Sequence, residues 1–221
     1  MKIGVCIPCC FSGLKYINRL LLSIENQTIK PDIVCISISG ISENIDLPVY
    51  TTTFDLNIIR TINNKNAAEN RNIAALKIRD IVDILSFFDV DDYMHPQRLE
   101  SIKNVFSNHN CDFFLHNYLC VSRNLEDVSI IHSNINTIDI INDVENRVEL
   151  QHSNSNFICG FKNNIDVPLA NGHISCRSSL FFTEFFPENA IGYEDSKFSG
   201  DLFIKKYICK FTSDKLSLYF S

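Results

Sequence analysis

The chain has 221 residues, of which 45% are hydrophobic and 21% are charged, a composition typical of a folded globular protein rather than a disordered one. This length is enough for one sizeable hydrophobic core, so we expect a single domain spanning residues 1–221. The formal net charge of −6 argues against a nucleic-acid partner, because phosphate backbones bind basic surfaces. The apolar runs are too short to cross a bilayer, so we expect no transmembrane segment.

The N-terminal residues 1–8 contain too short an apolar stretch for a signal peptide and are typical of a first strand. Nine cysteines without regular spacing then predict reduced thiols and a cytoplasmic location. The heavy use of Ile, Asn and Lys is typical of AT-rich genomes, such as those of large viruses or parasites.

The first half of the chain alternates between strand and helix patterns. Apolar runs predict strands at 3–7, 32–39, 48–53 and 84–88, and helical spacing predicts helices after Ser12, at 67–79 and from Pro96. This alternation favours an α/β sandwich with a mostly parallel sheet.

The second half is less regular. We expect strands at 111–121, 128–132, 157–161 and 172–179, a brief helix at 180–186, a helix at 194–209 and a closing edge strand at 211–220. No repeat, linker or low-complexity tract divides the chain, which again favours one domain.

An acidic cluster follows the apolar run 84–88. Asp89, Asp91 and Asp92 crowd three carboxylates into four positions at the end of a predicted buried strand, where parallel sheets bind ligands. Like charges this close repel unless a cation or strong donors neutralise them. Asp89 and Asp91 point to the same side of an extended backbone, so they can share a hard divalent cation such as Mg²⁺ or Mn²⁺.

The same cluster also fits a solvated loop whose Asp residues cap the helix after Pro96. A calcium loop of the EF-hand kind is excluded, because Met94 stands where such a loop needs Gly and Pro96 interrupts it.

Residues 87–96, Phe-Phe-Asp-Val-Asp-Asp-Tyr-Met-His-Pro, resemble the Asp-x-Asp region of family 2 glycosyltransferases. In that family an apolar strand ends in Asp-x-Asp-Asp, and a short loop, a Pro and a helix follow. Further segments match in the same order, namely 5–8 (Val-Cys-Ile-Pro), 66–72 (Asn-Ala-Ala-Glu-Asn-Arg-Asn), 177–181 (Arg-Ser-Ser-Leu-Phe) and 192–195 (Gly-Tyr-Glu-Asp). The matches extend over most of the chain, and their order and spacing are more specific than any one of them.

The resemblance implies the Rossmann-like GT-A fold, a three-layer α/β/α sandwich with a mostly parallel mixed sheet. It also implies a nucleotide-binding half of about residues 1–110 and an acceptor-side half of about residues 111–221. The implied activity is that of an inverting, metal-dependent hexosyltransferase. Such an enzyme moves a sugar from a UDP- or GDP-sugar to a hydroxyl of a glycan, lipid-linked or protein-linked acceptor.

The resemblance also implies roles for residues on the donor side. Asp91 would be the principal ligand of Mn²⁺ or Mg²⁺, and Asp89 would face the nucleotide ribose and the metal shell. Arg71 would lie near the nucleotide or its pyrophosphate, to which a guanidinium fork is suited. Taken alone, Arg71 fits a solvated helix arginine better than a ligand-binding residue. Pro8 and Ser39 fall at the remaining donor-side positions.

On the acceptor side the resemblance makes Asp195 the base that removes the proton from the attacking hydroxyl. At a helix start Asp195 would be held ionised by the helix dipole and free amide groups, although acidic residues are also common there for stability alone. Asp92, His173 and Glu194 are secondary candidates on this side. A lone His in a short strand is more often structural.

The chain departs from the family pattern at its second strand. Family members usually end this strand in an Asp that contacts the nucleotide base, whereas this chain has Ser39, a weaker hydrogen-bonding group. The nucleotide identity is therefore open.

Two other patterns have ordinary explanations. Residues 6–9, Cys-Ile-Pro-Cys, have the form of a thiol redox motif, but Cys6 lies inside the predicted strand, where buried Cys packs as a small apolar residue. Phe181-Phe182 and Phe185-Phe186 fit the core, or alternatively an apolar lip for a lipid-linked acceptor in peripheral contact with a membrane.

Two rival functions stay open. A phosphohydrolase of the haloacid dehalogenase type also uses Asp-x-Asp at a strand end, but near its N-terminus, usually with Thr or Val where this chain has Tyr93. A non-catalytic nucleotide-sugar-binding module would keep the fold and lose turnover, and the presence of Asp91 and Asp195 argues against it.

Overall fold

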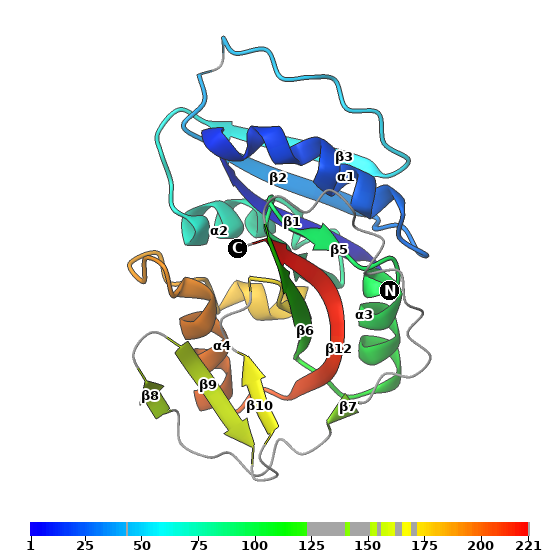
Figure 1. Ribbon diagram of the computed structural model, residues 1–221, viewed down its shortest axis with the longest axis vertical. Helices are drawn as coiled ribbons and strands as arrows, with labels where there is room; N and C mark the ends of the chain where they lie inside the picture. Colours follow the sequence, from blue (N-terminus) through cyan, green and yellow to red (C-terminus); the bar gives the residue numbers. More distant parts are fainter. Residues whose placement is uncertain are drawn as a thin grey trace.

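The computed structural model describes residues 1–42, 44–122, 140–141, 151–153, 156–161, 165–168 and 172–220. Its centre is a nine-stranded mixed sheet in the order β3-β2-β1-β4-β11-β6-β12-β5, with β7 paired to β12 (Figure 1). The strands of this sheet are β1 (Ile3–Cys10), β2 (Ile33–Ser39), β3 (Asp55–Thr61), β4 (Ile84–Phe87), β5 (Tyr93–Met94), β6 (Phe113–Val121), β7 (Ile140–Ile141), β11 (Ser175–Arg177) and β12 (Cys209–Phe220).

Half of the sheet is purely parallel. Strand β1 pairs in parallel with β2 on one side and β4 on the other, and β3 pairs in parallel with β2. The antiparallel β11 then lies between β4 and β6, and β12 runs parallel to β6. The carboxyl ends of β1 to β4 therefore meet at one edge of the sheet, the edge where open α/β folds bind ligands.

Helices cover both faces of the sheet. One core packs α2 (Ala67–Ile78), α4 (Glu194–Ile204) and the 3₁₀ helix η3 (Ser178–Phe182) against one face. The other core packs α1 (Ile17–Glu25) and α3 (Arg98–Asn108) against the opposite face. Because both faces are covered, β1 and β4 are buried almost throughout, in keeping with their continuous apolar sequences. The expected three-layer α/β/α sandwich with a mostly parallel mixed sheet is confirmed.

Helix α2 shows how local sequence starts an element. Asn66 Oδ1 accepts from the Glu69 amide at 2.9 Å, and Glu69 Oε2 accepts from the Asn66 amide at 2.8 Å. This capping box satisfies two amides that a helix start leaves without partners. The helix predicted at 67–79 is confirmed to within one residue.

Two elements of the first half differ from expectation. The strand expected at 48–53 is wrong, because the third strand is β3 at Asp55–Thr61, a half-exposed edge strand whose apolar pattern is weak. The 3₁₀ helix η1 (Phe11–Tyr16) precedes α1 and has no side-chain cap, so Ser12 does not cap it. Helix α3 begins at Arg98, just beyond the predicted start at Pro96.

In the second half the predicted helices and strands are shortened. Helix α4 ends at Ile204, and Lys206, with φ of 64°, turns the chain toward β12. Strand β12 is not an edge strand, because it lies between β6 and β5. The expected helix 180–186 is the 3₁₀ helix η3, and the strand expected at 172–179 is only β11. The strand expected at 128–132 lies outside the described residues.

A second, small sheet contains β8 (Gln151–Ser153), β9 (Asn156–Phe161) and β10 (Ile165–Pro168), in the antiparallel order β10-β9-β8. In β9 the strand expected at 157–161 is confirmed. Among the described helices, none has both the length and the apolar character needed to cross a membrane.

Candidate active site

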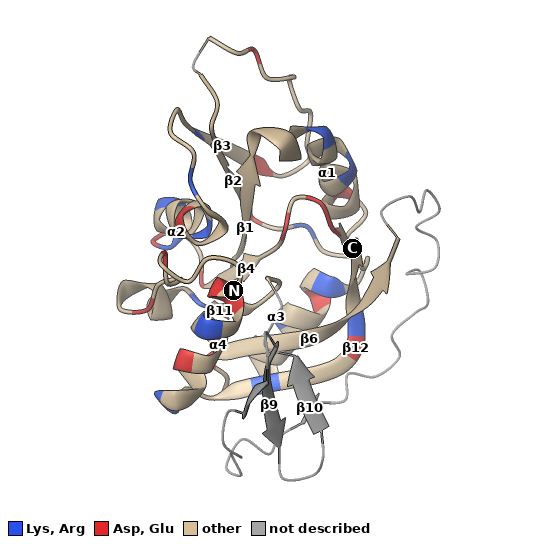
Figure 2. Cartoon of the chain, turned by 60° about the vertical axis from the view of Figure 1, so that its left-hand side comes forward, with Lys and Arg blue, Asp and Glu red and all other residues tan. Residues whose placement is uncertain are grey.

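The acidic segment lies where β4 leaves the sheet. Strand β4 ends at Phe87, and residues 88–92 form the loop to the short strand β5. We call residues 88–92 the acid loop. Phe88 is buried in the core, so the loop is anchored at its start, and the acidic residues follow at the carboxyl edge of the parallel strands (Figure 2). The strand-end position predicted for Asp89, Asp91 and Asp92 is confirmed.

Arg71 joins two carboxylates from distant parts of the chain. From the buried face of α2, one guanidinium nitrogen donates to Asp89 Oδ1 at 2.6 Å, and another donates to Glu194 Oε1 at 2.8 Å. Arg71 is only 3% exposed, so it is not the solvated helix arginine that its sequence position also allowed. Burial alone would lower the pKa of Arg71. The negative charges of the nearby carboxylates, Asp89, Asp195 and Glu194, outweigh burial and raise this pKa.

The same pairing controls Asp89. Burial alone would raise the pKa of Asp89, but the charges of Arg71 and His173 and the Arg71 hydrogen bond lower it below its ordinary value. Gly172 packs against this ion pair so closely that a Cβ on it would lie 2.4 Å from Asp89 Oδ2 and 2.6 Å from Arg71 Nη2. A side chain at 172 would therefore force the Asp89 and Arg71 side chains to shift from this pairing.

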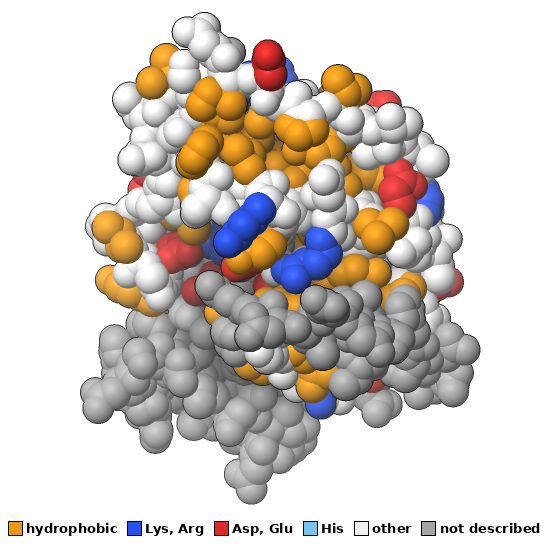
Figure 3. All heavy atoms as spheres, turned by 45° about the horizontal axis from the view of Figure 1, so that its top comes forward, with side chains coloured by type: hydrophobic (Ala, Val, Ile, Leu, Met, Phe, Trp, Pro, Cys, Tyr) orange, Lys and Arg blue, Asp and Glu red, His pale blue; other side chains and the backbone are white. Residues whose placement is uncertain are grey.

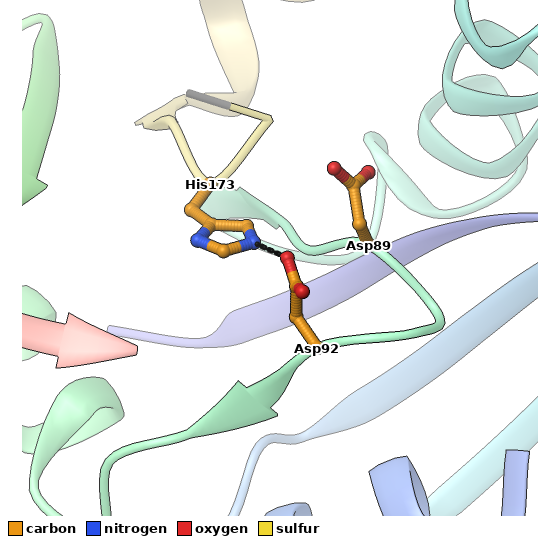
Figure 4. Close-up of side chains that lie close together, drawn as sticks. All are labelled: Asp89, Asp92 and His173. Atoms are coloured by element: carbon orange, nitrogen blue, oxygen red, sulfur yellow. Dashed lines mark hydrogen bonds and ion pairs between the residues drawn. The ribbon is translucent and has the colours of Figure 1, made fainter. Parts of the chain in front are cut away.

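Asp92 forms a second, buried pair with His173. Nε2 of His173 lies 2.8 Å from Asp92 Oδ2, and Nδ1 lies 2.8 Å from Ser217 Oγ (Figure 4). The other Asp92 oxygen accepts from the Phe220 amide at 3.0 Å. Burial raises the pKa of Asp92, although His173 and the Phe220 amide act in the opposite direction.

A ligand atom of Asp89, one of Asp92 and one of His173 lie within 4.8 Å of one another. Two carboxylates and one imidazole suit Mn²⁺ or a similar divalent cation, so the residues present fit such an ion. Asp91 is not part of this group of three. It lines the adjacent cleft, and its main-chain oxygen accepts a hydrogen bond from Arg19.

Asp195 and Glu194 lie in the first turn of α4, as the sequence predicted. Asp195 Oδ1 accepts from the Ser196 amide at 2.6 Å. The Ser196 amide and the Arg71 charge both lower the pKa of Asp195, as expected for a carboxylate held ionised. Burial is the larger effect, however, and it raises this pKa above the ordinary 3.8, so the expectation is only partly met. A raised pKa makes the ionised carboxylate a stronger base.

An open cleft of about 680 Å³ adjoins these side chains. Its charged lining combines Lys15, Lys65 and Arg71 with Asp89, Asp91 and Glu194, and Pro8 lines it from β1. On the face drawn in Figure 3, basic side chains lie next to acidic ones near the middle of the molecule. The volume and the mixed charge suit a ligand that carries phosphates together with a cation.

Ser39 is not part of the cleft lining. It is buried, and its hydroxyl accepts from Asn70 Nδ2 at 3.0 Å, while Asn70 Oδ1 accepts from Ser37 at 2.9 Å. Asn70, which lines the cleft, was missed by sequence reasoning. Its position next to Arg71 in the same helix could have indicated that Asn70 lies near the site.

Sequence reasoning also missed Arg98, which joins the end of β4 to the segment that carries His173. This fully buried side chain donates to Ser86 Oγ at 2.8 Å, to the Phe87 carbonyl at 3.1 Å, to the His173 carbonyl at 2.9 Å and to His116 Nε2 at 3.0 Å. Burial lowers the pKa of Arg98 to about 9. The sequence shows only a charged residue in an amphipathic helix, so no local pattern reveals that it is buried.

The cysteines and the Phe pairs follow their ordinary explanations in part. Cys6 lies within β1, and none of the eight described cysteines, Cys6 and Cys9 included, is in a disulfide. Phe181 and Phe186 are buried in the core, whereas Phe182 and Phe185 are exposed.

Solved structures with a similar fold include those of S. aureus TarS. The fragment 1–349 in complex with UDP has a TM-score of 0.67 and 17% identity, and its pairing covers 100% of this chain and 61% of that chain. The same fragment in complex with UDP-GlcNAc has a TM-score of 0.68 and 16% identity, with 100% of this chain and 59% of that chain covered. A longer TarS structure has a TM-score of 0.67 and 18% identity, with 100% of this chain and 37% of that chain covered. This chain therefore covers less than two thirds of each of these solved chains, and at these identities the likeness shows the GT-A fold alone.

A comparison with curated protein sequences gave no match. The family model described as glycosyl transferase family 2 matches residues 4–167, which is most of the chain and contains the acid loop, Arg71 and Asp89. The chain belongs to glycosyl transferase family 2.

Proposed function

We propose that this protein is a metal-dependent, inverting glycosyltransferase that moves a hexosyl group from a nucleotide-sugar donor to an acceptor hydroxyl. The observation that carries the proposal is the bridge of Arg71 to Asp89 and Glu194. It brings the acid loop of the first half next to the Glu194-Asp195 pair of the second half, as a two-substrate site requires. The acceptor hydroxyl belongs to a glycan or to a lipid-linked or protein-linked glycoconjugate.

The donor would lie in the cleft between Pro8 and the acid loop. The complexes of TarS with UDP and UDP-GlcNAc support a UDP-sugar as the donor. GDP-sugars are also to be tested as donors, because Ser39 stands where the family usually has an Asp that contacts the nucleotide base. Asp89, Asp92 and His173 would hold Mn²⁺ or Mg²⁺, and Asp91 would add a carboxylate from the lining of the adjacent cleft. When bound, such an ion would neutralise the negative charge that grows on the departing diphosphate.

Arg71 contributes a fixed positive charge on the same side. Its Nε is buried without a hydrogen-bond partner among the described residues. Buried N–H groups normally have an acceptor, so a bound ligand could supply the acceptor for this one. A phosphate oxygen is an acceptor of the required kind. This supports a location of the pyrophosphate near Arg71.

Asp195 would act as the base. Its carboxylate takes the proton from the acceptor hydroxyl as that oxygen bonds to the anomeric carbon, while the bond from this carbon to the diphosphate oxygen breaks. The nucleotide leaves as a diphosphate, and attack from the opposite face inverts the anomeric centre.

Calorimetry with UDP, GDP, CDP and ADP in the presence of Mn²⁺, followed by a hydrolysis assay on the matching sugar nucleotides, tests the proposal. Metal-dependent binding of one diphosphate with slow release of sugar from its donor supports a transferase. Phosphatase turnover without nucleotide preference would instead identify a phosphohydrolase. Binding without any turnover, even with acceptors present, would identify a binding module.

A further inference from the structure

Arg19 connects helix α1 to the acid loop, which lies about 70 positions further along the chain. Its Nη2 donates a hydrogen bond to the main-chain oxygen of Asp91. Asp91 lines the cleft, whereas Arg19 is not among the described residues that do so. Arg19 therefore contacts the backbone that carries an acidic side chain of the cleft, and not the space that a ligand would occupy.

The ring of Phe220, in β12, supports the same guanidinium. Cζ of Arg19 lies 3.9 Å from the centroid of this ring. An aromatic ring attracts a cation placed over its face, and a planar guanidinium is well suited to this contact. Phe220 is only 3% exposed and packs with Tyr93 and Leu218, so its ring gives the guanidinium a fixed support.

Strand β12 also holds the acid loop at the residue after Asp91. The main-chain amide of Phe220 donates to Asp92 Oδ1 at 3.0 Å. Earlier in β12, Ser217 Oγ lies 2.8 Å from Nδ1 of His173, and Nε2 of this imidazole lies 2.8 Å from Asp92 Oδ2. Two consecutive residues of the loop are thus tied beside the groups that fit a divalent cation, one by its main chain and one by its carboxylate.

The surroundings of Arg19 are not those of an arginine that only interacts with solvent. Its Nε is buried and has no hydrogen-bond partner among the described residues. Holding a guanidinium in this way costs stability, because buried N–H groups normally have an acceptor. Departures of this kind from the rules of stable packing are typical of functional sites.

We propose that Arg19 and Phe220 form a brace that holds the acid loop in its cation-binding conformation, and that Arg19 is a positioning residue for this cation. The inference rests on the proposed metal-dependent function. The bond from Arg19 keeps the Asp91 side chain in the cleft lining. The bond from the Phe220 amide to Oδ1 of Asp92 keeps Oδ2 beside His173.

The experiment titrates the protein with Mn²⁺, alone and then with UDP or GDP, and follows free Mn²⁺ by electron paramagnetic resonance. The variants are Arg19→Met, Arg19→Lys and Phe220→Leu, and thermal unfolding measures the stability of each. Arg79→Met is the matched control, because Arg79 is also partly exposed and is not among the described residues that line the cleft. Arg79 has the same kinds of contact, since it donates to the Phe181 carbonyl at 2.7 Å and lies 4.3 Å from the Phe182 ring centroid.

We expect Arg19→Met to weaken Mn²⁺ binding by about 10- to 100-fold, the usual effect of losing a group that orients metal ligands. Arg19→Lys should recover part of this loss, because the ammonium can donate to the Asp91 carbonyl but has no planar group to lie on the ring. Phe220→Leu keeps the amide that binds Asp92 and should weaken binding by about threefold. Arg79→Met should keep the Mn²⁺ affinity of the parent, whatever its effect on thermal unfolding.

The brace and the proposed function can fail separately. If the parent binds Mn²⁺ and Arg19→Met binds it as tightly, or if Arg79→Met loses as much affinity as Arg19→Met, the brace is wrong and the function stands. Should Arg19→Met not fold, parental Mn²⁺ affinity in both Arg19→Lys and Phe220→Leu would overturn the brace. If the parent binds no Mn²⁺ with either diphosphate, the proposed metal dependence fails, and the brace fails with it.

Discussion

Arg71 of α2 and Asp89 of the loop after β4 form an ion pair of 2.6 Å. The same guanidinium also holds Glu194 at 2.8 Å, and Gly172 leaves no room for a side chain beside the pair. The acid loop and the start of α4 are therefore fixed relative to each other through one buried cation.

Replacing Arg71 with Ala should destabilise the protein by about 3 kcal/mol, because two largely buried carboxylates lose their counter-charge. Urea unfolding measures the change. Arg60→Ala is the control, since Arg60 is exposed and, among the described residues, donates only to the Ile45 carbonyl. Its expected effect is within about 0.5 kcal/mol. Equal losses for the two variants would show that the bridge contributes little.

Asp91→Asn should weaken Mn²⁺-dependent binding of the nucleoside diphosphate by about tenfold or more, because an amide is a poorer ligand for a hard cation than a carboxylate. Calorimetric titration with and without Mn²⁺ measures this. Asp80→Asn, at an exposed carboxylate of the surface, should leave affinity unchanged. Unaltered affinity in Asp91→Asn would remove Asp91 from the metal site.

Asp195→Asn should retain donor binding and lower transfer by about 10²–10⁴-fold, the usual contribution of a general base. Since the base must be ionised, and the pKa of Asp195 is raised above 3.8, activity of the parent should fall with decreasing pH through a value above 3.8. The acid limb of a kcat/KM profile measures it. Asp201→Asn on the same helix is the control, and full transfer in Asp195→Asn would refute the assignment.

Arg98→Met should destabilise the fold by about 2–4 kcal/mol, because four buried acceptors lose their donor. Ser86→Ala removes only one of these bonds and should have an effect of about 1 kcal/mol. Chemical unfolding of both variants measures the difference. A Met variant as stable as the parent would mean that packing alone supports the acid loop.

Alkaline pH should destabilise the protein through its buried thiols. Burial raises the pKa of Cys35 and of Cys111 to about 12, from an ordinary 9.0. Above pH 9.0 the unfolded thiols lose protons that the folded thiols keep. Stability is therefore complete below this value and decreases as pH rises toward 12, by up to about 1.4 kcal/mol per pH unit for each thiol.

Urea unfolding at about pH 8 and about pH 10 measures this loss. Cys35→Ala should reduce the pH dependence, whatever its effect on absolute stability. Cys10→Ala, at an exposed thiol that is solvated in both states, should leave it unchanged. An identical pH dependence in Cys35→Ala and the parent would contradict the explanation.

Local sequence was sufficient for the elements whose causes are local. The capping box at Asn66 and Glu69 starts α2, and the apolar run 84–87 ends in the acid loop, so both could be read from neighbouring residues. The motifs in their order also predicted the family, the three-layer fold and the strand-end location of Asp89 and Asp91. Strand β3 was missed because an edge strand that is half exposed carries little apolar pattern.

Only the tertiary structure decided which of these residues meet. Arg71 and Glu194 are 123 positions apart, and His173 and Asp92 are 81 apart, so no local spacing could pair them. The burial of Arg98 and the place of β12 inside the sheet depend in the same way on strand order. Sequence determines local conformation through nearby backbone and side-chain bonds, whereas a site built across the sheet depends on long-range register, which exists only once the chain has folded.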